Sequence, residues 1–160
     1  MTVESTRVEV VRVGPDSTGR DQLAALRQGW VEENAGSPID DPAYAESFRQ
    51  WWSRERDRRL AWLARIDGAA VGMLSMAVFD RMPKPGSPPS RWGYLSNVFV
   101  LPGHRDGGIG RRLVDTALEH ARCEAYTRVV LAPSERSRLF YGRAGFGPAD
   151  NLLVHAMDRS

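Results

Sequence analysis

The stretch from Val98 to Arg111 constrains the fold more than any other part of the chain. It reads Val-Phe-Val-Leu-Pro-Gly-His-Arg-Asp-Gly-Gly-Ile-Gly-Arg. The apolar run predicts a strand that ends at Pro102, and the glycines predict a tight loop leading into a helix that begins near Ile109. The N-terminus of such a helix exposes backbone N–H groups, which bind phosphate oxygens. The stretch therefore predicts a strand–loop–helix unit with a candidate diphosphate site in its loop.

The spacing of the glycines disfavours two common nucleotide-binding motifs. The dinucleotide fingerprint requires Gly-x-Gly-x-x-Gly, which this stretch does not contain. The P-loop requires Lys and then Ser or Thr after its last glycine, whereas Gly110 is followed by Arg111 and Arg112. A helix start that uses its glycines only for a tight turn also fits the motif, so the loop alone does not decide between a phosphate site and a turn.

Composition narrows the possible classes of protein. The chain has 160 residues, which favours one domain over residues 1–160. Its net charge of +2 gives no broad basic surface, so nucleic acid is not an expected partner. Cys123 is the only cysteine, which excludes an intrachain disulfide, and the three histidines lack ligand spacing. We therefore expect no metal site.

No apolar run approaches the length of a membrane span, and we expect no membrane partner. The stretch from Met1 to Ser5 lacks the apolar core of a signal peptide. These observations predict a cytoplasmic protein.

Periodicity predicts an alternation of strands and helices along the chain. Expected strands cover 7–13, 60–66, 71–79, 92–101, 128–132 and 152–157. Expected helices cover 20–33, a second segment that follows a cap at Asp40-Asp41-Pro42, residues 109–121, and a short segment around 139–141. Residues 80–90 hold four prolines and are expected to form a loop. The order predicts a mixed sheet flanked by helices, in which the strands on either side of helix 109–121 run parallel.

Two separated segments of the chain carry recognisable motifs. The first is Asn97-Val-Phe-Val followed by Arg105-x-x-Gly-x-Gly. The second is Ser134-x-x-Ser-x-Leu-Phe-Tyr-x-x-x-Gly-Phe146. Both resemble motifs of the GNAT-type acyl-CoA N-acyltransferases and occur in that family's order, and the resemblance covers roughly residues 7–158. It implies an α/β (α+β) fold with a mixed, mostly antiparallel sheet of six to seven strands flanked by four helices.

The resemblance also implies a binding site for acetyl-CoA, which serves as the acyl donor. The implied diphosphate site comprises Arg105, Asp106, Gly107, Gly108, Ile109, Gly110 and Arg111. The implied pantetheine contacts are the backbone of Val98, Phe99 and Val100, together with Ser134 and Ser137. The family often has Asn where Ser134 stands and Ala where Ser137 stands, so a side-chain amide contact to pantetheine is absent here.

Tyr141 is the side chain that we expect to act in catalysis. An amine that attacks a thioester expels a thiolate, and a nearby phenol can protonate that thiolate as it leaves. An ordinary phenol has a pKa of about 10 and is therefore protonated at neutral pH. The alternative is a tyrosine that packs in the core of its helix, but its place in the second motif favours the acid role.

The general base and the acceptor are not identified by the sequence. Glu32, Glu33, Asp80 and His104 are candidate bases, each of which also fits a solvated surface charge. In the family the first two helices border the acceptor site, and Trp30, Trp51, Trp52 and Trp62 are expected in the core or in the walls of that groove.

The function that these observations favour is transfer of an acetyl group to a primary amine of a small molecule or peptide. Two alternatives stay open at this point: a non-catalytic module that binds acyl-CoA, and an acetyltransferase that acts on charged transfer RNA. Thiol release with a panel of amines would separate the first alternative from an enzyme, and the small net charge disfavours the second. A homodimer is compatible with the sequence, as are acyl chains other than acetyl.

Overall fold

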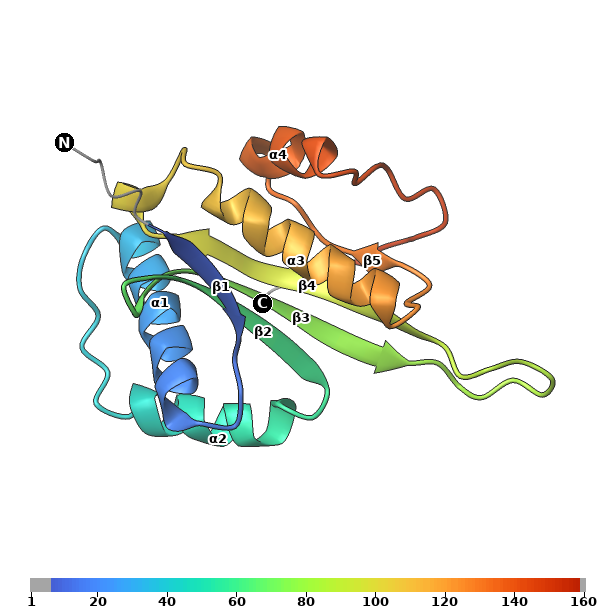
Figure 1. The fold of residues 1–160 in the computed structure, drawn as a ribbon, viewed down its shortest axis with the longest axis horizontal. Helices are drawn as coiled ribbons and strands as arrows, with labels where there is room; N and C mark the ends of the chain where they lie inside the picture. The colour runs from blue at the N-terminus through green and yellow to red at the C-terminus, as the bar shows by residue number, and fades with distance from the viewer. Residues whose placement is uncertain (1–6, 159–160) are drawn as a thin grey trace.

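The computed structural model describes residues 7–158, which form one five-stranded sheet with helices on both faces (Figure 1). The strands are β1 (Val8–Arg12), β2 (Arg59–Ile66), β3 (Ala69–Asp80), β4 (Arg91–Val100) and β5 (Val129–Val130), and their order in the sheet follows the chain. All neighbouring pairs are antiparallel except β4 and β5, which are parallel. The α/β fold, with its mixed, mostly antiparallel sheet, is therefore confirmed.

Four α-helices flank the sheet, as the sequence predicts: α1 (Ser17–Ala35), α2 (Tyr44–Glu55), α3 (Ile109–Cys123) and α4 (Arg138–Arg143). Short 3₁₀ turns precede α3 at Pro102–His104 and α4 at Glu135–Ser137. Helices α1 and α2 cover one face of the sheet with a core that includes Leu26, Leu63 and Met73. Helix α3 covers the other face, where Leu113 is fully buried, and residues of α4 pack against the edge of that core.

Two helices begin at positions that differ from the prediction. Helix α1 starts three residues early, because Asp16 accepts a hydrogen bond from the Gly19 N–H at 3.4 Å and caps it. Helix α2 starts later than the expected cap at Asp40-Asp41-Pro42. Its N-cap is Ala43, whose N–H donates to Asp41 Oδ1 at 3.0 Å. The aspartate therefore shapes the turn that precedes the helix.

The number of strands was predicted too high. Residues 152–157 form no strand, and Leu153 and Val154 are 99% and 91% exposed. A strand needs a paired neighbour, and β5 is limited to two residues, which offers little ladder to extend. The described sheet thus has five strands and not six to seven. The predicted absence of a signal sequence concerns Met1–Ser5, which lie outside the described residues.

A β-bulge in β4 decides which side chains face each side of the sheet. Ser75 pairs with Ser96 and Met73 pairs with Phe99, so β4 carries one extra residue opposite this stretch of β3. The extra residue is Asn97, whose φ of 56° is left-handed. Because the bulge changes the alternation, Val98 packs toward α3 while Phe99 packs toward α1 and α2.

Helix α3 packs directly against the backbone of β3 at Gly72, which has no side chain. A Cβ at this position would come within 3.2 Å of Leu113 Cδ1 and 3.3 Å of Ile109 Cγ2. Gly72 therefore fixes how deeply the first turns of α3 sit on the sheet. None of the helices in the described range combines the length and apolarity needed to cross a bilayer.

Candidate active site

The C-terminal half of β4 has an open edge. Strand β5 pairs only with Gly93 and Tyr94, and no other described strand takes its place beyond them. The Leu101 N–H donates to the Val71 carbonyl at 2.9 Å, toward β3. Since backbone groups alternate in direction along a strand, those of Val98 and Val100 face the open side. This edge can pair with an extended chain of amides.

A cavity of about 580 Å³ adjoins this open edge, between β4, the start of α3, and α4. Ten of the residues predicted to contact the donor or to act in catalysis line it. They are Val98, Val100, Arg105, Asp106, Gly108, Ile109, Gly110, Arg111, Ser137 and Tyr141. The two predicted motifs therefore meet in space although they lie far apart in the sequence.

The loop before α3 has the geometry of an anion site. Gly108 is the N-cap of α3 with a φ of 84°, and no side chain caps the helix. The N–H groups of the first helical turn have no partner within the helix and carry its partial positive charge. A Cβ on Gly110 would lie 3.5 Å from Phe140 Cζ and 3.8 Å from Val100 Cγ2, where it would narrow the cavity. Gly108 thus supplies the left-handed backbone conformation of the N-cap, and Gly110 keeps the cavity beside these amides wide.

Arg105 ties this loop to α1. Its guanidinium donates to both carboxylate oxygens of Glu33 at 2.8 Å, and its Nε donates to the Val100 carbonyl at 2.9 Å. The hydrogen bond from Arg105 lowers the pKa of Glu33. The sequence predicts a cation beside the phosphates, whereas here the guanidinium is bound to protein groups while it still lines the cavity. The same interaction explains why Glu33 is unsuited as a general base.

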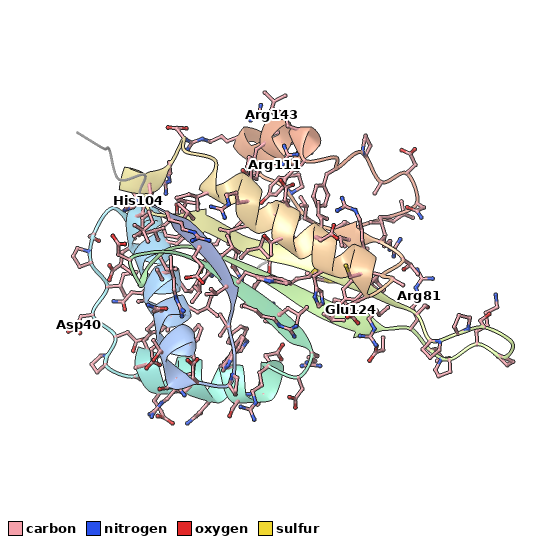
Figure 2. The ribbon with its side chains drawn as sticks, viewed as in Figure 1. Asp40, Arg81, His104, Arg111, Glu124 and Arg143 are labelled. Atoms are coloured by element: carbon pink, nitrogen blue, oxygen red, sulfur yellow. The ribbon has the colours of Figure 1, made fainter. Side chains whose placement is uncertain are left out.

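Four further residues of the cavity were not predicted as donor contacts: His104, Arg136, Phe140 and Arg143. Figure 2 shows Arg111 at the start of α3 and Arg143 on α4, and both belong to the cavity wall. Arg111 pairs with Asp115 at 2.9 Å, while no ion pair within residues 7–158 involves Arg136 or Arg143. The rim is therefore cationic. Phe140 and Arg143 lie three residues apart on α4, and this helical spacing could have identified them.

Three predicted contacts do not line the cavity. The Phe99 side chain lies on the opposite face, where its ring stacks on Trp30 with centroids 5.7 Å apart. Ser134 is hydrogen-bonded to Ser137, which lines the cavity, and their hydroxyl oxygens are 2.9 Å apart. Gly107 belongs to the loop, and a Cβ there would meet no atom within 4 Å.

The Tyr141 ring is held between two other aromatic rings at the cavity wall. Its centroid lies 5.0 Å from that of Phe140 and 5.8 Å from that of Phe146. Burial raises the pKa of the Tyr141 hydroxyl. The phenol therefore remains protonated at neutral pH, as an acid catalyst requires.

A second cavity, of about 390 Å³, lies on the other face of the sheet beneath α1 and α2. Its floor includes Asn97, whose side-chain amide donates to the hydroxyl of buried Ser75 at 3.1 Å. Asn97 lines this cavity and the next residue, Val98, lines the first, so the two cavities adjoin the same point of β4. Of the expected aromatic walls, Trp51 lines the cavity, whereas Trp52 and Trp62 are buried in the cores.

None of the four candidate bases lines the second cavity. Glu32 accepts hydrogen bonds from Gln28 and from the Ile39 N–H, and Glu33 is bound to Arg105. Asp80 lies at the end of β3 near Arg91, and His104 lies on the first cavity. Within residues 7–158, no three His, Cys, Asp or Glu side chains are placed to hold a metal ion together.

Comparisons with known proteins agree with this geometry. Residues 23–146, more than half of the chain, match the Acetyltransferase (GNAT) family. An uncharacterized N-acetyltransferase of Archaeoglobus fulgidus is 35% identical over 113 residues, which cover 64% of this chain and 69% of that protein. A mycothiol acetyltransferase of Frankia alni is 31% identical over 124 residues, covering 73% of this chain but only 36% of the relative.

A solved structure supports the fold independently. The crystal structure of a predicted acetyltransferase with acetyl-CoA from Clostridium acetobutylicum superposes with a TM-score of 0.71 at 19% identity, covering 94% of this chain and 96% of that one. At that identity the likeness concerns the fold alone. The family match over residues 23–146 shows that the chain belongs to the acetyltransferase (GNAT) family and is an enzyme of the acyltransferase class.

Proposed function

We propose that the chain is an N-acetyltransferase that moves an acetyl group from acetyl-CoA to the primary amine of a small molecule or peptide within a ternary complex. One observation carries this proposal: the two cavities adjoin consecutive residues, Asn97 and Val98, from opposite faces of β4. A donor on one face and an acceptor on the other can therefore meet at the bulge. The single sheet with both faces covered supports one domain over the described residues.

The features of the first cavity suit the phosphates and the pantetheine arm of acetyl-CoA. The uncapped start of α3 and the cations of the rim suit the phosphates. The backbone of Val98 and Val100 suits the amides of the pantetheine arm, which would add to β4 like a short strand. The Val100 carbonyl already accepts a hydrogen bond from Arg105, so the groups left for pairing are mainly those of Val98 and the Val100 N–H.

Two groups of the protein assist the reaction in this proposal. Acetyl-CoA supplies a thioester whose C–S bond breaks as the amine nitrogen forms a bond to the acetyl carbon. The backbone N–H near Val98 polarises the thioester carbonyl as a hydrogen-bond donor. The hydroxyl of Tyr141 gives its proton to the leaving sulfur, and the proton that the attacking nitrogen releases passes through solvent to restore the phenol.

Calorimetry and a thiol-release assay test the proposal together. Acetyl-CoA should bind the folded protein, and adding a mixed library of primary amines should release free thiol and give at least one acetylated product by mass spectrometry. Binding without thiol release from any amine would instead favour a module that only binds acyl-CoA. Failure to bind coenzyme A or its esters would disprove the proposal.

A further inference from the structure

The second cavity carries a specific charge pattern. Nine residues line it, from the floor of the sheet to the helices above: Leu23, Arg27, Tyr44, Ser47, Phe48, Trp51, Met73, Ser75 and Asn97. These nine, all within the described part of the chain, include one cation, Arg27, and no carboxylate. If the proposed function holds, this cavity receives the acceptor amine, and its lining then selects the acceptor.

The charge of Arg27 is not neutralised by the protein. Within residues 7–158 no carboxylate lies within 4.0 Å of its guanidinium, whose Cζ lies 5.1 Å from the centre of the Trp30 ring. The carboxylate of Asp41 borders an adjoining cavity of about 170 Å³ that Arg27 also lines, but its Oδ1 accepts the Ala43 N–H. An arginine stays charged at any working pH and presents two parallel N–H donors to a carboxylate.

The middle of the cavity is aromatic and rigid. The rings of Tyr44 and Phe48 lie 6.0 Å apart, and those of Phe48 and Trp51 lie 5.4 Å apart along α2. The Tyr44 hydroxyl donates to the Ala24 carbonyl at 2.7 Å, which fixes this ring against α1. These walls favour a flat apolar group.

The floor suits the reacting nitrogen. The amide nitrogen of Asn97 donates to the hydroxyls of Ser75 and Ser96 at 3.1 and 3.4 Å, so its Oδ1 is the atom that can accept a hydrogen bond from an amine. The floor adjoins Val98, beside which the proposed thioester would lie. The cavity therefore offers a hydrogen-bonding floor, an apolar middle and a cation.

We propose that the acceptor is a small amine that carries a carboxylate, joined to its nitrogen through an apolar or aromatic group, and that Arg27 binds the carboxylate. One arginine balances one negative charge, which matches a carboxylate better than a phosphate dianion. Polyamines and other polycations are disfavoured, because a second positive charge would lie against Arg27 with no carboxylate in the lining to compensate it. This inference rests on the proposed function and names its substrate class.

A matched series of benzylamines tests the charge requirement. We would compare 4-(aminomethyl)benzoate, benzylamine and 4-(aminomethyl)benzylamine, which share the reacting nitrogen and the ring and differ only in the para group. Acetyl transfer is followed by thiol release at saturating acetyl-CoA, and binding of each amine to the coenzyme A complex is measured by calorimetry. The expected order of kcat/KM and of affinity is anionic, then neutral, then cationic.

Variants at Arg27 identify the residue responsible. Arg27→Gln should raise the KM and Kd of the anionic amine by about five- to tenfold relative to those of benzylamine, a modest factor because the guanidinium is exposed. Arg27→Glu should reverse the preference toward the dicationic amine. Arg54→Gln, at the exposed end of α2, is the matched control and should change neither value.

The two proposals fail in different ways. Turnover of all three amines without preference for the anionic one, or an equal effect of Arg27→Gln on all three, would overturn the assignment of the acceptor while leaving the acetyltransferase intact. Arg27-dependent binding of the anionic amine without thiol release would support the acceptor site and contradict the enzymatic proposal. No binding and no turnover of any of the three would overturn the acceptor site.

Discussion

At the scale of single residues, Tyr141 is the side chain whose chemistry can be isolated most cleanly. Replacing it by Phe removes one hydroxyl and keeps the ring between Phe140 and Phe146. We expect Tyr141→Phe to lower kcat by about a hundredfold or more, because the thiolate then leaves without a proton donor. The Kd of acetyl-CoA should change little.

The matched control for this variant is Tyr126→Phe. Tyr126 is also partly buried, but it packs against His120 at the other end of α3 and lies outside the first cavity. Steady-state thiol release and calorimetry on both variants make the comparison. Unchanged kcat in Tyr141→Phe would remove this residue from the mechanism.

The raised pKa of Tyr141 predicts the shape of the pH profile. A phenol is the acid form below its pKa, so raising the pKa extends the active form to higher pH. We expect kcat to rise as the amine deprotonates and then to stay level up to at least about pH 10, the ordinary phenol pKa. The measurement is kcat from about pH 6 to 10. A decline with a midpoint below about pH 10 in the wild type, absent from Tyr141→Phe, would contradict the raised pKa.

Gly108 tests the phosphate site, because it combines a φ of 84° with the N-cap position of α3. Gly108→Asp places a Cβ and a negative charge beside the amides that would bind phosphate. We expect the Kd of coenzyme A to rise by about tenfold or more. Gly36→Asp is the control for backbone strain, since Gly36 has a φ of 74° at the end of α1 and lines no described cavity. Equal affinities of the two variants for coenzyme A would contradict the assigned site.

At the scale of elements, the bulge in β4 organises the site, and its conformation depends on Asn97. A φ of 56° suits Asn and Gly but strains a β-branched residue. We expect Asn97→Val to cost about 1–2 kcal/mol of folding free energy, and a chain of this size loses about 2–4 °C of Tm for each kcal/mol. Asn97→Gly loses the same side-chain hydrogen bonds without the backbone strain, so it should keep a higher Tm than Asn97→Val and should retain the affinity for coenzyme A. Thermal denaturation decides between these outcomes, and a Val variant as stable as the Gly variant would show that the backbone strain is unimportant.

How far the sequence predicts each element depends on how local its causes are. The four helices, the 81–90 loop and the glycine-rich turn follow from caps, prolines and periodicity, which act within a few residues. The bulge was not predicted. In the structure Leu95 and Val98 face the same core, so the alternation of side chains between the two faces of the sheet is broken between them. Residues 152–157 look like a strand in isolation, but a strand requires a partner that periodicity does not supply.

In the candidate site, too, the features with local causes were predicted, and those that depend on the packing of distant elements were not. The residues of the two motifs meet as predicted because both belong to short, locally determined segments on neighbouring elements. The ion pair between the Arg105 guanidinium and Glu33 was not predicted. Glu33 lies 72 residues away, and only the packing of α1 on the sheet brings the two side chains together. The second cavity, too, is formed by α1, α2 and the bulge, and no single segment of the sequence encodes it.

At the scale of the whole molecule, the depth at which α3 packs on the sheet connects the core to the first cavity. Gly72 lies under Ile109 and Leu113, and Ile109 also lines the cavity beside Gly108. A larger residue at position 72 must displace α3, because Leu113 is fully buried and has no space to move. We expect Gly72→Val to cost about 1–3 kcal/mol in stability and also to weaken the binding of coenzyme A, although position 72 lines neither cavity.

A second substitution separates this coupling from general damage. Ile109→Ala removes the side chain that a Cβ at position 72 would meet at 3.3 Å, so the double variant should recover part of both the Tm and the affinity lost in Gly72→Val. Thermal denaturation and calorimetry with coenzyme A on the four proteins of this cycle measure the interaction. If the losses of the two single variants simply add in the double variant, the depth of α3 on the sheet is not what connects position 72 to the coenzyme A site. Recovery of affinity together with stability would mean that the depth of α3 on the sheet sets the position of the amides at its N-terminus.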